Sequence, residues 1–263
     1  AFALPLIMIA SALFAGAWAF IPGYLQAKRG SHVVITTIMM NFIATSMMSY
    51  IISRILKPEE INSDESARIA DVTRVPFLSE WIPLLRNTPV NISFILAILA
   101  LIGVYILIWH TKFGYALRTM GHNSTAARYA GMSNAKLIMA TMAISGALVG
   151  MVAVNDTAGA HGRLILGYVA GTGFVGIAVA FMGKAHPIGV GLSALLFGVL
   201  YQGGQELAFT MPAITREMIV TIQALVILFT GAMSNMLRRP VEFVFLAARQ
   251  KQEPDPVAQE KGA

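Results

Sequence analysis

Eight polar side chains fall inside stretches of the chain that are otherwise apolar. They are Asn41, Asn155, Asp156, His161, Gln202, Gln205, Glu206 and Gln223. Burying such a group in apolar surroundings costs a few kcal/mol unless it finds a hydrogen-bond partner or lines a wet cavity. The set therefore indicates either a solute pathway or a seam of hydrogen bonds between helices. Asn41 and Gln223 are most simply interhelical hydrogen bonders. Asp156 and Glu206 lie near expected outer helix ends, where water can solvate them.

The histidines and carboxylates that could support catalysis or metal binding show no pattern that indicates either. The histidines are scattered over His32, His110, His122, His161 and His186. The chain has no HExxH helix, no carboxylate pair at glycosidase spacing and no cysteine. The middles of the apolar stretches hold no acid, Lys or His, which disfavours proton-coupled transport. Amide and hydroxyl groups among aromatic side chains instead suit a small neutral, hydroxyl-rich solute.

Nucleotide and nucleic-acid binding are not indicated either. Gly183 and Lys184 in GIAVAFMGKA do not form a phosphate-cradling loop, because the preceding glycine spacing is wrong and Ala185 stands where a magnesium-binding hydroxyl is needed. The sequence pI near 9.7 is not accompanied by a basic stripe with interleaved aromatic residues. We therefore expect no cofactor in this chain and no nucleic-acid partner.

The composition is that of an integral membrane protein. Of the 263 residues, 56% are hydrophobic and 12% are charged, and the mean hydropathy is +0.68, whereas a soluble domain carries about 25% charged residues. Seven windows are apolar enough to cross a bilayer. They cover residues 3–26, 32–56, 91–110, 137–155, 168–183, 188–206 and 217–237. The predicted fold is an all-α, polytopic bundle of about seven membrane-spanning helices in a lipid bilayer.

The charges predict which ends of these helices face the cytoplasm. If the loop 111–136 is cytoplasmic, the inner segments hold twelve of the 19 Lys and Arg residues but four of the 13 acids. An excess of Lys and Arg is typical of cytoplasmic loops. The pattern therefore predicts a cytoplasmic C-terminus.

The expected transmembrane domain covers residues 1–244. It includes an outer segment, 57–90, which is too long for a tight turn and too polar to cross lipid. Within it, PFLSEWIPLL with Trp81 suits a short interfacial helix or a receptor-docking element. Residues 245–263 are polar and contain prolines, which predicts a disordered cytoplasmic tail. The chain begins without Met and already inside an apolar run, so we expect sequence upstream of it.

Two glycine pairs and one polar loop have recognisable spacing. Gly146 with Gly150, and Gly167 with Gly171, show the GxxxG spacing that lets helix backbones approach closely in lipid, and we expect packing at both. The loop 111–136, TKFGYALRTMGHNSTAARYAGMSNAK, contains four basic residues and no acid.

A short helix from about Ser124 to Tyr129 is expected in this loop. It can use Asn123 as its N-cap and end at Gly131, which accepts a positive φ. The small side chains of Ala126 and Ala127 would let the groove of a partner close on it. We predict a rigid contact element, with a free cytoplasmic loop as the alternative.

The chain resembles the permease subunit of bacterial ATP-binding cassette importers of the branched-chain amino acid and ribose type. Four stretches occur in the same order: IPGYLQAKRGSHVVITTIMMNFIA, LRTMGHNSTAARYAGMSNAK, SGALVG followed by GAHGRL, and GFVGIAVAFMGKAHPIGVGLSALLFGVL. The resemblance covers nearly the whole chain and is closest to the branch serving nucleosides and simple sugars. In that family the loop forms the coupling helix, which implies a coupling role for Gly121, Asn123, Ala126, Ala127, Arg128, Ala130, Gly131 and Met132. Relatives often carry an acid shortly before the GAHGRL-like run, the place of Asp156.

The resemblance also implies an assembly. It comprises two permease chains around one path, two cytoplasmic ABC ATPase subunits that bind ATP and Mg²⁺, and an extracytoplasmic solute-binding protein. Family members also have further helices upstream. The sequence thus predicts a transport subunit of the bacterial inner membrane, without enzymatic activity, that moves a nucleoside or simple sugar by alternating access. The expected pathway residues are Asn41, Asn155, Asp156, Gln202 and Gln223. Alternatives are import of a pentose or a branched-chain amino acid, or a membrane scaffold or receptor that moves no solute.

Overall fold

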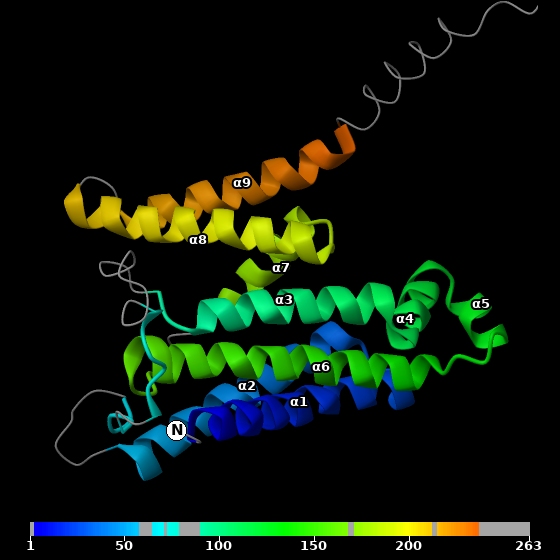
Figure 1. Cartoon of the computed structure of the whole chain (residues 1–263), viewed down its shortest axis with the longest axis horizontal. Coiled ribbons are helices and arrows are strands. Elements are labelled where there is room, and N and C mark those ends of the chain that lie inside the picture. The colour runs from blue at the N-terminus through cyan, green and yellow to red at the C-terminus, as the bar shows by residue number, and fades with distance from the viewer. Residues whose placement is uncertain are drawn as a thin grey trace, which may run out of the picture. The chain divides into compact units, whose positions relative to one another are not determined.

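The computed structural model shows helices joined by short irregular segments (Figure 1). It describes residues 3–57, 65–70, 73–78, 90–167, 171–211 and 215–236. The predicted interfacial helix around Trp81 and the predicted tail 245–263 lie outside these residues. The chain divides into two compact units, Ala1–Ala170 and Gly171–Ala263, which are taken in turn.

In its described residues, the first unit contains four long helices and two short ones. In chain order they are α1 (Ala3–Arg29), α2 (Val33–Ile51), α3 (Ser93–His110), α4 (Lys112–His122), α5 (Ser124–Tyr129) and α6 (Asn134–Val154). Two helices continue into π-helical turns: α2 into η1 (Ile52–Leu56) and α6 into η5 (Asn155–His161). The predicted span 137–155 is thus too short at its C-terminal end, because the helix continues to His161.

Helices α1 and α6 pack antiparallel along most of their length. A Cβ atom built on Gly146 would lie 2.5 Å from the carbonyl oxygen of Ala15, and one built on Gly150 would lie 2.6 Å from that of Ser11. The Ser11 hydroxyl donates a hydrogen bond to the Gly150 carbonyl at 2.8 Å. Only glycine allows backbones to approach this closely, so the packing role predicted for Gly146 and Gly150 is confirmed.

The same prediction is wrong for Gly167 and Gly171. Both have positive φ, +77° and +92°, and Gly171 is the N-cap of the next helix rather than part of a helix face. A Cβ atom on either would meet nothing within 4 Å. These glycines supply left-handed backbone at the turn before the second unit, because an L side chain is disfavoured there.

The second unit contains α7 (Thr172–Met182), α8 (Pro187–Thr210) and α9 (Arg216–Met236). Helix α7 ends in a tight turn in which Lys184 and Ala185 both have φ of +52°. Gly183 lies so close to Gly189 that a Cβ atom on Gly189 would be 2.4 Å from the Gly183 oxygen. The turn therefore brings the end of α7 directly against the start of α8.

In the described part of the chain, five helical segments are long and apolar enough to cross a membrane. They are Ala3–Arg29, Val33–Leu56, Ser93–His110, Asn134–His161 and Pro187–Thr210. The predicted spans 168–183 and 217–237 correspond to shorter apolar stretches, Thr172–Met182 and Met218–Phe229. Eleven residues of α7 extend about 16 Å, roughly half of a hydrocarbon core. The turns at Gly171 and Gly183 limit its length.

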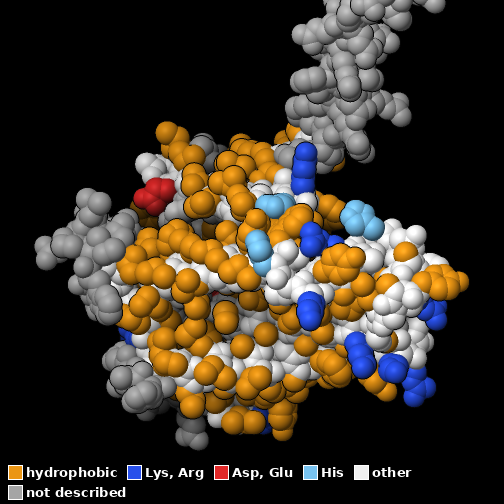
Figure 2. Space-filling view, turned by 45° about the vertical axis from the view of Figure 1, so that its right-hand side comes forward, with side chains coloured by type: hydrophobic (Ala, Val, Ile, Leu, Met, Phe, Trp, Pro, Cys, Tyr) orange, Lys and Arg blue, Asp and Glu red, His pale blue; other side chains and the backbone are white. Residues whose placement is uncertain are grey.

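The surfaces of the long helices are predominantly apolar (Figure 2). Leu13, Phe42 and Leu99 are among many large hydrophobic side chains that are exposed. Such surfaces are stable in contact with lipid. The all-α, multi-pass membrane architecture expected from the composition is therefore confirmed.

The α1–α6 contact gives a testable prediction. Gly146→Leu should lower the melting temperature of the purified protein in detergent, because overpacking typically costs about 1–3 kcal/mol and the obstructing Ala15 atom belongs to the backbone. Gly103→Leu, on α3, is the matched control, since a Cβ atom there meets nothing within 4 Å. Equal melting temperatures for the two variants would contradict this account of the packing.

Candidate functional site

A rigid corner joins α3 to the loop that follows it. The Thr111 hydroxyl caps α4 by accepting a hydrogen bond from the Gly114 N–H at 3.1 Å. A Cβ atom on Gly114 would lie 2.2 Å from the Ile108 carbonyl oxygen, so the corner requires glycine. The Arg118 guanidinium stacks over the Trp109 ring, 4.5 Å from its centroid. These contacts fix α4 to the end of α3, and α4 itself was not predicted from the sequence.

Helix α5 is capped at both ends. The Asn123 side chain accepts hydrogen bonds from the N–H groups of Thr125 and Ala126, each at 3.0 Å. At the other end Gly131 has a φ of +76°. Its N–H donates to the Arg128 carbonyl, while the Met132 N–H donates to the Ala127 carbonyl, a Schellman motif. The N-cap and the positive-φ stop predicted at Asn123 and Gly131 are confirmed.

The exposed face of α5 differs from the one expected. Ala127 is fully buried, at 0% exposure, so it anchors α5 to its own chain and cannot contact a partner. Ala126, Arg128 and Tyr129 are exposed, and Tyr129 retains 90% of its accessible surface. The expectation that Ala126 and Ala127 both face a partner is therefore wrong for Ala127. Tyr129, which the sequence analysis missed, is the protruding aromatic side chain of the element.

The remaining residues of the predicted coupling set surround this helix. Gly121 lies exposed in the last turn of α4, and Ala130 is the C-cap of α5. Met132 is half-buried between α5 and the Ser133 N-cap of α6. All eight residues thus lie within one short stretch that links α4 to α6.

Basic residues gather at this end of the first unit. Lys28 and Arg29 end α1, and the loop adds Lys112, Arg118, Arg128 and Lys136. Figure 1 shows the end of α1, the end of α3, the start of α6 and both loop helices at the same end of the unit. Figure 2 shows Lys and Arg side chains on that side of the molecule. The described acids of this unit, Glu65 and Asp156, lie at the opposite end.

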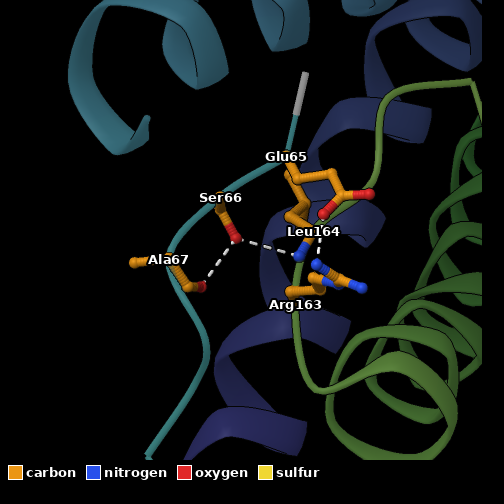
Figure 3. A network of polar contacts seen from close by, with 5 residues as sticks. All are labelled: Glu65, Ser66, Ala67, Arg163 and Leu164. Carbon is orange, nitrogen blue, oxygen red and sulfur yellow. Dashed lines mark hydrogen bonds and ion pairs between the residues drawn. The ribbon is translucent and has the colours of Figure 1, made fainter. Parts of the chain in front are cut away.

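At that opposite end, part of the predicted outer segment folds over the end of α6. The Ser66 N–H donates to the Leu164 carbonyl at 3.0 Å, and the Leu164 N–H donates to the Ser66 hydroxyl at 2.9 Å. Glu65 forms an ion pair with Arg163 (Figure 3). Glu65 also forms an isolated antiparallel β-bridge with Ile165. We call residues 65–66 with 163–165 the outer clasp, after the predicted outer segment to which residues 65–66 belong. It joins segments almost 100 positions apart in the chain.

Asn91 and Asn155 make a second link at this end. The Asn91 amide donates to the Asn155 side-chain oxygen at 2.9 Å, and both side chains lie against Gly159. A few residues away, Val75, Val154 and Ala158 form a small buried apolar cluster. Asn155 therefore has a structural partner. Asn91 was missed from the sequence because no spacing pattern relates it to Asn155.

The predicted pathway residues lie in three places. Asn155 and Asp156 are adjacent in η5, where Asp156 is half-buried and its backbone oxygen accepts a hydrogen bond from His161 Nδ1 at 3.1 Å. Asn41 is exposed on α2. In the second unit Gln202 is exposed on α8, whereas Gln223 of α9 is buried, with 8% exposure. The pathway role of all five stays a prediction.

A cavity of about 530 Å³, open to one side and lined mainly by apolar side chains, lies between α1, α2 and α6. This volume falls in the range of about 300–1,000 Å³ that is usual for small-molecule sites. Its wall includes Phe14 and Trp18 of α1, Met47 and Met48 of α2, Met142 and Ser145 of α6, and Leu164 of the outer clasp. Within the described residues, no group of three or more His, Cys, Asp or Glu side chains could hold a metal ion.

Comparison with known proteins assigns the class. Residues 2–231 match the family described as branched-chain amino acid transport system / permease component. The chain belongs to this family. No solved structure matches the chain significantly.

Three curated relatives make the relationship more specific. A guanosine ABC transporter permease of Bacillus subtilis is 37% identical over 233 residues, 87% of this chain and 65% of that protein. A glucose ABC transporter permease of Haloferax volcanii is 32% identical over 86% of this chain and 60% of its own length. A nucleoside ABC transporter permease of Lactococcus lactis is 31% identical over 86% of this chain and 62% of its own length. The chain thus spans less than two thirds of the length of each of these relatives.

The caps of α5 give a second testable prediction. Asn123→Ala should destabilise α5 by about 0.5–2 kcal/mol, because two N–H groups lose their acceptor. Limited proteolysis of the purified protein should then cut the 111–136 loop faster. Asn123→Asp is the matched control, since its carboxylate can accept the same two hydrogen bonds. Unchanged cleavage in the Ala variant would contradict the capping role.

Proposed function

We propose that the chain is the membrane-spanning permease subunit of an ATP-binding cassette importer that carries a nucleoside or a related simple sugar. The observation that carries this proposal is the rigid, exposed α5 held between two membrane-spanning helices in a chain of this permease family. A contact element capped at both ends can transmit motion, because it moves as one body with the helices beside it.

The mechanism follows from how α5 is attached. Ala127 and the corner at Gly114 fix the loop helices to α3 and α6, while Tyr129 and Arg128 project outward. A partner groove that takes Tyr129 and moves with ATP binding and hydrolysis would displace the ends of α3 and α6. That displacement would turn the permease from an outward-open to an inward-open state. The chain supplies no chemistry of its own.

The partners proposed are those that such a subunit requires. Two ABC ATPase subunits would bind ATP and Mg²⁺ and contact α5, a second permease subunit would complete the path, and an extracytoplasmic solute-binding protein would deliver the solute. The end with α4 and α5 would face the cytoplasm of the bacterial inner membrane, because the segments assigned to that side hold twelve of the 19 Lys and Arg residues of the chain. The C-terminus would lie on the same side.

The relatives' names favour the solute class. Two of the three are named for guanosine or nucleosides and one for glucose. A pentose or a branched-chain amino acid remains the alternative within transport. A scaffold or receptor that binds a partner through residues 111–136 without moving a solute is the alternative outside it.

Uptake measurements test the proposal directly. Cells with the full set of transporter genes should take up radiolabelled guanosine and adenosine, and deletion of this gene should abolish that uptake. Ribose and leucine, tested in parallel, distinguish the other solute classes. Equal uptake of all four solutes with and without the gene would overturn the nucleoside assignment.

Coupling is tested by a substitution at the end of α5. Gly131→Val should uncouple ATP hydrolysis from uptake while leaving membrane insertion intact. The reason is that a left-handed conformation costs an L residue about 1–2 kcal/mol, and a β-branched one more. Gly131→Asn is the matched control, because asparagine tolerates positive φ. Normal solute-stimulated ATPase activity and uptake in the Val variant would remove the coupling role.

A further inference from the structure

Leu164 belongs to two features of the first unit at once. It is part of the wall of the cavity between α1, α2 and α6. Its backbone N–H and carbonyl are both held by Ser66 of the outer clasp. Leu164 is therefore shared by the clasp and the cavity wall.

Few interactions hold the outer clasp together. Ser66 is buried, with 7% exposure, and its hydroxyl accepts from Leu164 while donating to the Ala67 carbonyl (Figure 3). The ion pair of Glu65 with Arg163 is partly exposed. Partly exposed ion pairs are weak because water competes for both charges. A few hydrogen bonds and one such pair therefore hold the clasp closed.

The cavity wall has the chemistry of a site for a flat, partly apolar ring system. Trp18 and Phe14 offer aromatic faces for stacking, and Ser145 offers a hydroxyl that can donate or accept. The methionine side chains of α2 and α6 are flexible and polarisable, so they can adapt to rings of different outline.

Helix α6, which forms one wall of the cavity, directly follows the loop 111–136 that contains α5. Helix α6 begins after the Ser133 cap next to α5 and continues through η5 to His161. These 28 residues span about 42 Å as a continuous helix. Ser145 lies on this helix, and the clasp residue Arg163 follows its end by two positions. A displacement at α5 would therefore reach both the cavity and the clasp.

We propose that this cavity holds the nucleobase of the solute in transit and that the outer clasp closes its outer end. The base stacks on Trp18 and Phe14, and Ser145 supplies a hydrogen bond. Opening the clasp admits the solute from the outer side, and closing it precedes release to the inner side. This inference rests on the proposed function as a nucleoside permease.

The occupant of the cavity is tested by cysteine labelling, since the 263 residues include no cysteine. Ser145→Cys is made in the full-length chain, on a background without other cysteines, in the assembled transporter. A small water-soluble maleimide should label it, and guanosine should slow the labelling. Ala70→Cys, at an exposed position of the polar segment 65–70 and outside the cavity wall, is the control, and guanosine should leave its labelling unchanged. Labelling of Ser145→Cys by a lipid-soluble maleimide alone, or no protection by guanosine, would overturn the proposal in favour of a lipid chain or protein in the cavity.

The clasp is tested by a reversible cross-link. Because the Ser66 N–H bonds to the Leu164 carbonyl, Glu65 and Ile165 form a non-hydrogen-bonded antiparallel pair. The Cα atoms of such a pair lie about 4.5 Å apart, within the range for a disulfide. Glu65→Cys with Ile165→Cys should lose guanosine uptake on oxidation and recover it on reduction. Each single variant, treated with oxidant in the same way, should keep its uptake.

Equal uptake by the oxidised and reduced double variant, with the disulfide shown to be formed, would overturn the role of the clasp. Failure of the proposed function is distinguishable from this result. A wild-type transporter that takes up no nucleoside refutes the proposed function. A wild-type transporter that does so, with unprotected Ser145→Cys and an inert cross-link, refutes only the inference about the cavity and the clasp.

Discussion

The close contact of α1 and α6 is the interaction on which the first unit depends. Lipid tails are as apolar as the side chains they meet, so burial of apolar surface does little to bring membrane helices together. Contact distance and hydrogen bonding between backbones become decisive instead. Gly146 and Gly150 bring the two helices within reach of each other's carbonyl groups, and the Ser11 hydroxyl bonds to one of them. Most of the other features of this unit are attached to α6.

The two ends of α6 carry contrasting structures. At the basic end, short capped helices and a glycine corner give a firm element with an exposed aromatic side chain. At the other end the helix widens into a π-helical turn, and the backbone then turns through Gly162 in a left-handed conformation. Irregular backbone leaves N–H and carbonyl groups that need partners. The extended residues 65–69 provide some of them, through bonds to Gly162 and Leu164.

The second unit also depends on irregular backbone, which lies at both ends of the short helix α7. Helix α7 is enclosed by glycine-dependent turns, and its connection to α8 places two residues other than glycine at positive φ. Such a conformation is disfavoured for Lys184 and Ala185, and the bonds of Lys184 to Phe181 and of Ala185 to Ala180 hold it. Within this unit, Gly204 of α8 admits the Ile219 side chain of α9, another close approach made possible by a missing Cβ atom.

The sequence by itself determined the membrane class, the positions of the long helices and the caps of α5. Hydropathy and cap chemistry depend on residues close together in the chain, so Asn123 and Gly131 could be assigned before any contact was known. Only the tertiary structure decided which glycine pair packs against another helix. The pairs Gly146/Gly150 and Gly167/Gly171 have the same spacing, but only the first pair lies within a helix, whereas the second has positive φ. It also decided that Ala127 is buried while Tyr129 projects, that Asn91 meets Asn155, and that Ser66 holds Leu164. Asn91 and Asn155 are separated by 64 positions in the chain, and Ser66 and Leu164 by 98. No local sequence pattern encodes pairings over such separations.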